Sequence, residues 1–234
     1  MSTKRAARTR DGSEPLLPAD WNEQSLEALC CKLITYGIVQ PGPHDVGGVP
    51  FVQTRDLEEG PLDSQRLDRT TASIHAAYAR SAIFPGDIVI GIRASVGAVA
   101  HVPQDLVEAN ISRGVARLSP CDEVDGGYFY WALQSPLATQ NVGKATKGST
   151  YSEITLPALR NVCVPVPPLP EQRAIAAALS DVDELIGALD RLIAKKRAIK
   201  LATMQQLLTG RKRLPEFEKN AGFRYSQIGV IPND

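Results

Sequence analysis

The residues best suited to binding an anion lie between positions 143 and 150. This segment spaces its glycines like a phosphate-binding nucleotidase loop, but Ser149 stands where the lysine of that motif belongs, so a nucleotidase is not favoured. Its lysines, hydroxyl groups and backbone N–H groups suit the phosphate oxygens of DNA. A solvated loop without a ligand is the alternative, because such compositions are common in loops. We predict a DNA-facing loop with contacts from Lys144, Thr146, Lys147, Ser149 and Thr150.

Two other segments carry donors for phosphates or guanine edges. Arg93 and Ser95 lie between two predicted strands, and residues 110–117 include Ser112, Arg113 and Arg117. Ordinary surface charge is the alternative for both segments, because arginines are more often surface charges than base readers. We add Arg93, Ser95 and Arg113 to the candidate DNA-binding residues.

The motifs of catalysis and of metal binding are missing. An amino-methyltransferase needs a glycine-rich cofactor loop and an Asn/Asp-Pro-Pro-aromatic motif, whereas Pro167-Pro168 is followed by Leu169. The three histidines are far apart, and the four cysteines form no CxxC pair. We therefore expect reduced thiols, no metal site, no catalytic residue and a non-catalytic chain.

The composition limits the kind of DNA contact. The chain has 234 residues, 43% of them hydrophobic, with 26 Lys and Arg against 26 Asp and Glu. This is enough apolar material for a core, but a net charge of zero excludes a binder that acts through bulk positive charge. The sequence has no apolar run of about 18 residues and no secretory signal pattern, so we expect a soluble, cytoplasmic protein without membrane contact.

The predicted elements begin after a polar, basic tail at residues 1–17. Asp20 or Asn22 is expected to cap a short helix through Leu26, Leu29 and Leu33, which Gly37 ends. Short apolar runs broken by glycine and proline then predict strands at residues 49–52, 87–90, 95–100, 114–118 and 161–166 and a buried helix at 128–134. Strands do not alternate with long helices, so the fold class is α+β.

A long helix is predicted from residue 169 to 210. Four prolines within residues 165–170 mark a boundary, and no proline follows until after Leu208, with Gly210 as the C-terminal cap. Apolar residues recur in alternating steps of four and three, at Ile175, Leu179, Val182, Ile186, Leu189 and Ile193. Lys196 interrupts this seam, which resumes in shifted phase. Such a seam needs a partner helix, and the alternative is a helix packed on its own domain.

The charges of this helix favour antiparallel pairing. Asp181, Asp183, Glu184 and Asp190 occupy the first half, whereas Arg191, Lys195, Lys196, Arg197 and Lys200 occupy the second half. Two antiparallel copies would place opposite charges face to face.

A Leu-Pro-Glu-Gln-Arg-Ala-Ile sequence at 169–175, after a Pro-Val-Pro-Pro run, begins a helix that closes with Leu-Leu-Thr-Gly. This pattern resembles the conserved region of specificity subunits of type I restriction-modification enzymes. Trp21 with its leucine-rich segment, residues 92–97 and residues 145–166 are similar to one target recognition domain of that family. Family members typically carry two such domains and two helices, whereas this chain has one of each.

The resemblance implies a non-catalytic subunit that reads double-stranded DNA. It would dock methyltransferase subunits and, through them, endonuclease subunits. S-adenosylmethionine, ATP and Mg are expected on those partner subunits, and no cofactor is expected on this chain.

We divide the chain into a basic tail (1–17), a target recognition domain (18–168), a spacer and dimerisation helix (169–210) and a C-terminal tail (211–234). Residues 228–234 echo residues 16–20, with a period of 214 from Pro18 to Pro232, so the tail resembles the start of a second repeat. The chain is either a half-length subunit or a fragment of a longer one.

We expect an antiparallel homodimer through residues 171–209 that recognises a bipartite palindrome. The alternative function is that of an interaction protein that no longer reads DNA and competes for methyltransferase or full-length specificity subunits.

Overall fold

The computed structural model describes residues 17–58, 60–148, 152–217, 222–227 and 229–232. Its contacts divide the chain into two compact units, Met1–Leu179 and Ser180–Asp234, which meet within one helix. Apart from Leu17, the predicted tail at 1–17 lies outside the described residues. Among the described helices, none is both long enough and apolar enough to cross a bilayer.

The largest sheet in the described part of the chain has four antiparallel strands in the order β2-β8-β5-β6. These are β2 (Thr35–Tyr36), β8 (Val115–Leu118), β5 (Ile88–Gly91) and β6 (Val99–His101). Ile88 and Ile90 pack into one core cluster with Phe129, whereas Val89 packs into a second cluster with Ile111. Because side chains alternate along a strand, β5 separates two apolar layers and is buried on both faces.

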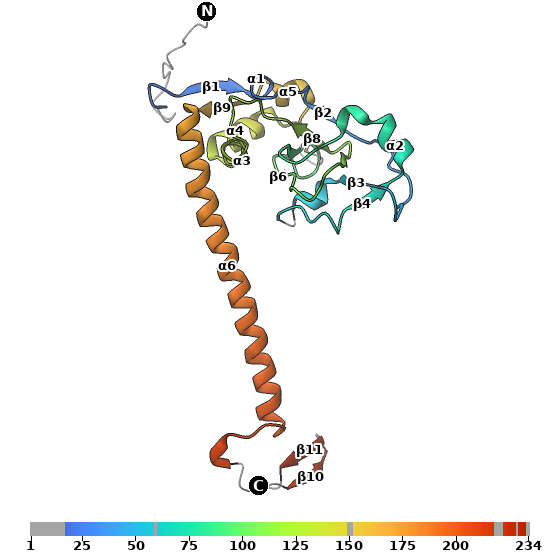
Figure 1. Cartoon of the computed structure of the whole chain (residues 1–234), viewed down its shortest axis with the longest axis vertical. Helices are drawn as coiled ribbons and strands as arrows, with labels where there is room; N and C mark the ends of the chain where they lie inside the picture. The colour runs from blue at the N-terminus through green and yellow to red at the C-terminus, as the bar shows by residue number, and fades with distance from the viewer. Residues whose placement is uncertain (1–16, 59, 149–151, 218–221, 228, 233–234) are drawn as a thin grey trace, which may run out of the picture. The chain divides into compact units, whose positions relative to one another are not determined.

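Smaller pairings complete the sheet structure. A second sheet has the order β4-β3-β7, and β1 pairs antiparallel with β9, so the start of the domain lies beside its end (Figure 1). Their bounds are β1 (Asn22–Ser25), β3 (Val49–Val52), β4 (Asp68–Thr70), β7 (Asn110–Ile111) and β9 (Cys163–Val166). A hairpin in the Ser180–Asp234 unit joins β10 (Phe223–Ser226) to β11 (Gly229–Pro232).

The helices of the first unit are mostly short. They are α1 (Leu26–Leu29), η1 (Thr54–Leu57), α2 (Ala72–Ala77), η2 (Ala79–Ser81), α3 (Gly126–Gln134), α4 (Pro136–Ala145) and α5 (Leu156–Arg160). The helix α6 (Leu169–Leu208) spans both units, and η3 (Pro215–Phe217) follows it. Together with the sheets they confirm the predicted α+β fold with a long helix at its end.

The sequence prediction was wrong at the start of the domain. Residues 22–25 form β1 rather than a helix, because pairing with β9 satisfies their backbone groups. The helix α1 begins only at Leu26, capped by the Ser25 hydroxyl, which accepts a hydrogen bond from the Ala28 N–H at 3.3 Å. It ends before Leu33, and Gly37 lies beyond it in an approach to β7.

Most other predicted elements are confirmed. The apolar runs coincide with β3, β5, β8 and β9, and the buried helix coincides with α3. Only the end of the predicted strand at 95–100 is regular, because residues 92–97 form a loop that turns at Gly97, where φ is 88°. Gly210 has a φ of 68° and follows α6, as predicted for a helix C-cap. Residues 228, 233 and 234 of the proposed repeat lie outside the described residues.

Candidate nucleic-acid interface

Three loops meet at the end of β5. Ile92 N–H donates to the Gly114 carbonyl at 2.8 Å, Ala94 N–H donates to the Ser152 carbonyl at 3.2 Å, and Ile154 N–H donates to the Ile92 carbonyl at 3.0 Å. Residues 92–94 therefore lie between the turn that follows β7 and the segment that follows the lysine-containing loop. The structure thus places residues 92–94 beside Gly114 of the second selected segment and beside residues 152–154, which pair through Glu153 with Lys147 of the lysine-containing segment.

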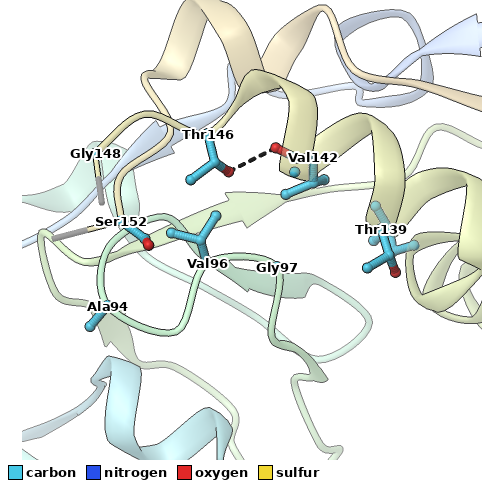
Figure 2. Close-up of a pocket in the computed structure, with 10 residues that line it drawn as sticks. Ala94, Val96, Gly97, Thr139, Val142, Thr146, Gly148 and Ser152 are labelled. Carbon is cyan, nitrogen blue, oxygen red and sulfur yellow. Dashed lines mark hydrogen bonds between the residues drawn. The ribbon is translucent and has the colours of Figure 1, made fainter. Parts of the chain in front are cut away.

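Two hollows adjoin these loops and share Ala94 and Ser152 as a common wall. The larger has a volume of about 580 Å³, and its polar lining includes Gln53, Thr54, Arg55, Arg93, Ser112, Arg113 and Glu153. The smaller has a volume of about 410 Å³. In Figure 2 the loop with Ala94, Val96 and Gly97 lies opposite the end of α4, which carries Val142.

Ala94 adopts a backbone conformation that costs free energy. Its φ is 60°, and no other non-glycine residue in the described part of the chain has a positive φ. Left-handed geometry disfavours residues with a Cβ and is enriched at functional sites. The strain thus falls in the wall between the two hollows.

Two predicted DNA contacts are engaged with carboxylates. Arg93 donates from Nε and Nη2 to Oε1 of Glu153, at 3.0 and 2.7 Å. The Ser95 hydroxyl donates to Glu58. Arg93 lines the larger hollow, and Ser95 lies in the chain between Ala94 and Val96, which line the smaller one. The contacts of Arg93 and Ser95 with DNA stay a prediction, and each contact requires an exchange of partners.

Arg113 is placed differently, because its side chain is exposed at the mouth of the larger hollow. Arg117, the other arginine of residues 110–117, is not available to DNA. Arg117 is only 7% exposed and donates to the carbonyls of Ala82, at 2.7 Å, and Leu33. Of the donors in residues 110–117, the structure therefore leaves Arg113 as the exposed cation.

Sequence reasoning missed a polar network that includes Gln53 and Arg55, which line the larger hollow. Asp68 accepts hydrogen bonds from Gln53, at 2.9 Å, and from Arg55, and it also contacts His44. Burial of the carboxyl group opposes its ionisation, but the hydrogen bonds from Gln53 and Arg55 prevail and lower the pKa of Asp68 below its ordinary value. Arg55 and Gln53 are 13 and 15 residues from Asp68 in the sequence, so no local sequence motif predicts these contacts.

The lysine segment is only partly a loop. Residues 143–145 form the end of α4, which places the exposed Lys144 in its last helical turn, whereas the prediction had a loop there. The Thr146 hydroxyl donates to the Val142 carbonyl at 2.7 Å (Figure 2). The exposed Lys147 exchanges two backbone hydrogen bonds with Glu153, at 2.8 and 2.9 Å, which closes the base of the loop. Ser149 and Thr150 lie outside the described residues.

The start of α6 is joined to the first unit by side chains that the sequence analysis did not explain. Gln172 is 1% exposed, accepts from the Asp125 N–H at 2.9 Å and donates to the Pro167 carbonyl at 2.9 Å. The Trp21 indole donates to Glu171 at 3.2 Å. The Glu-Gln pair of the Pro-Glu-Gln-Arg sequence therefore orients the first turn of α6.

Tyr128 adds a third connection near this helix start. Its hydroxyl donates to the Pro165 carbonyl at 2.8 Å, and its ring packs with Ala176 in a small buried cluster. Burial and the nearby charge of Glu171 raise the pKa of Tyr128 to about 12, which keeps the hydroxyl protonated as a donor.

We predict that Gln172→Ala lowers the free energy of unfolding by about 2–4 kcal/mol, because it leaves a buried N–H and a buried carbonyl without partners. Urea unfolding of the full chain, followed by circular dichroism, measures this change. Arg173→Ala is the matched control, since Arg173 is the next residue and is exposed, and it should change stability by less than about 0.5 kcal/mol. Equal stabilities for the two variants would contradict the assigned role of Gln172.

The apolar seam of α6 differs in burial between its first residue and the residues that follow. Ile175 is half-buried against the Tyr128 cluster. The other predicted seam residues have exposed fractions between 42% and 55%, namely Leu179, Val182, Ile186, Leu189 and Ile193. These five apolar side chains are therefore exposed in the single chain, as expected for a seam that pairs with a partner helix.

Within the described residues, no group of three or more His, Cys, Asp or Glu side chains could hold a metal ion. The chemistry of the interface is that of hydrogen-bond donors, acceptors and positive charges.

Comparisons with known proteins agree on one family. Residues 18–195 match the family model of the type I restriction modification DNA specificity domain. The specificity subunit of the type I restriction enzyme EcoBI from Escherichia coli is 27% identical over 187 residues, which cover 78% of this chain and 39% of that subunit.

Solved structures give the same result. A chain from a study of complex assembly and conformational transition of the type I R-M system has 27% identity and a TM-score of 0.61. The HsdS subunit from Thermoanaerobacter tengcongensis has 26% identity and a TM-score of 0.56. Each alignment covers 84% of this chain and 46% of the other, so the chain spans less than half of these relatives. The protein thus belongs to the type I restriction-modification DNA specificity domain family, as a specificity subunit with a target recognition domain followed by a long helix.

Proposed function

We propose that this chain contacts one half-site of double-stranded DNA for a type I restriction-modification complex and performs no catalytic step itself. It docks methyltransferase subunits and, through them, endonuclease subunits, and those partners bind S-adenosylmethionine, ATP and Mg. The observation that carries the proposal is the convergence of three donor-bearing loops at the end of β5, around a hollow with an exposed arginine.

The exposed lysines fit a role in phosphate binding. Lys144 and Lys147 come from the end of α4 and the loop beside it, next in sequence to Gly143, Thr146 and Gly148, which line the smaller hollow. Lysine charges that neutralise phosphates release condensed counterions, so they strengthen binding without selecting sequence.

We predict that the double substitution of Lys144 and Lys147 by alanine weakens binding to every DNA sequence. The slope of log K against log salt concentration should become shallower by about 2, since each lost phosphate contact contributes about 0.9. Fluorescence anisotropy between about 50 and 200 mM salt, with a specific and a random duplex, measures this slope.

Lys32→Ala is the control for this experiment. The Lys32 ammonium group lies 5.0 Å from the centre of the Phe84 ring, which precedes β5, whereas the three loops meet where β5 ends. Its removal should leave the slope unchanged. An unchanged slope in the double lysine variant would remove these two residues from the interface.

The exposed seam of α6 supports pairing with a second copy of the chain. The acidic half at 181–190 complements the basic half at 191–200 when two copies run antiparallel. A helix of 40 residues is about 60 Å long, so the pair would hold two recognition domains apart. Two-fold symmetry then makes the target a bipartite palindrome.

A shift assay with and without methyltransferase subunits tests the proposed function. We expect the assembled complex to prefer a defined sequence over a random duplex of the same length. Complex formation without any sequence preference would instead indicate an interaction protein that competes for these subunits.

A further inference from the structure

The larger hollow contains one arginine whose charge is not already balanced. Arg93 is paired with Glu153, and Arg55 is paired with Asp68. Within the described part of the chain, the guanidinium group of Arg113 has neither a carboxylate nor a hydrogen-bond partner. Its donors are therefore available to a ligand that enters the hollow.

The backbone that carries Arg113 is held from three sides. The Arg113 N–H donates to the Ile38 carbonyl at 2.8 Å, and the Ser112 N–H donates to the Val52 carbonyl at 2.8 Å. The Gly114 carbonyl accepts from Ile92, and a Cβ on Gly114 would lie 2.5 Å from the Thr54 hydroxyl oxygen. A side chain on such a fixed turn loses less freedom on binding and supports selective contacts.

The surroundings of Arg113 favour a base edge over a phosphate. Glu153 lines the hollow, and Asp68 is hydrogen-bonded to Gln53 and Arg55, which line it. These carboxylate oxygens are acceptors, and a DNA phosphate has no N–H or O–H to donate to them. A base edge presents both acceptors and donors, which match a guanidinium group beside carboxylate oxygens. Guanine offers O6 and N7 as two adjacent acceptors in the major groove, in the spacing that an arginine binds with two hydrogen bonds.

We propose that Arg113 is a specificity-determining residue that binds a guanine in each half-site through O6 and N7. The Arg93–Glu153 and Arg55–Asp68 pairs are positioning groups whose carboxylate oxygens can accept from the amino group of a base but not from a phosphate, which has no donor. The inference rests on the proposed function, because it names the base contact made by the same interface.

The test is selection from a pool of random duplexes, with the chain assembled with its methyltransferase subunits. Wild type is compared with Arg113→Lys, which keeps the charge but loses the two-pronged donor geometry. We expect the motif selected by wild type to contain a guanine. In Arg113→Lys the preference for guanine over other bases at that position should fall by about 10- to 100-fold, while the base preferences at the other positions stay the same. Arg113→Ala should lose the preference for guanine at the same position. If the alanine variant fails to fold, Arg113→Lys still tests the inference.

Arg80→Lys serves as the control, since Arg80 is an exposed arginine in η2 outside both hollows, and it should keep the wild-type motif. If Arg113→Lys binds every sequence more weakly but selects the same motif, Arg113 contacts phosphate and the inference is wrong. An unchanged motif with unchanged affinity also contradicts it. If wild type enriches no sequence, the proposed function itself fails and the inference falls with it.

Discussion

Replacing Leu189 by aspartate is expected to convert the proposed dimer of this chain into monomers. Leu189 lies in the seam of α6 and is 49% exposed in the single chain, so a partner helix would cover it. The substitution removes apolar burial and places an uncompensated carboxylate in the interface, and two-fold symmetry does so twice. We expect the dissociation constant of the dimer to rise by about a thousand-fold or more.

Ala188→Asp is the matched control for this change. Ala188 precedes Leu189, is exposed and lies outside the seam, so the same charge there should leave the dimer intact. Sedimentation velocity over a range of concentrations distinguishes the two outcomes. A Leu189→Asp chain that sediments like wild type would show that the seam has been assigned to the wrong face.

Replacing Gly37 by alanine is expected to destabilise the recognition domain by about 3 kcal/mol or more. A Cβ at this position would lie 1.7 Å from the carbonyl oxygen of Ile111. Because the obstacle is backbone in β7, no side-chain rotation relieves the overlap, and the strand must move. Gly37 N–H also donates to the Ser112 carbonyl at 3.2 Å, so the displaced turn is the one that carries Arg113. DNA binding should therefore weaken together with stability.

Gly143→Ala is the control for Gly37→Ala. Gly143 lies in α4, where a Cβ would meet no atom of another element within 4 Å, and alanine is the better helix former by up to about 1 kcal/mol. Thermal and urea unfolding should show equal or higher stability for this variant. Equal stability of the Gly37→Ala variant and wild type would contradict the close approach of residues 37 and 111.

The local pattern of the sequence was enough to predict much of the fold. The alternating steps of four and three and the absence of proline predicted α6, and Gly210 predicted its end. Apolar runs predicted β5 and β8 because both strands are buried on each face. The signals that predict these elements lie within the sequence of each element or next to it.

Elements that depend on distant partners could not be predicted in this way. Residues 22–25 become a strand because the distant strand β9, at residues 163–166, pairs with them. The charge of Arg93 is balanced by Glu153, which is 60 residues away, so the sequence could not distinguish it from the unpaired Arg113. The buried role of Gln172 likewise depends on Asp125 and Pro167.

The most direct test of a two-fold symmetric DNA reader is a methylome. The chain would be expressed with its methyltransferase as the sole specificity subunit, in cells that otherwise lack modification, and every methylated position would be sequenced. We expect methylation at one bipartite palindrome whose two half-sites are inverted copies. A non-palindromic bipartite motif from this chain alone would contradict the symmetric dimer, and methylation without any motif would contradict DNA reading by this domain.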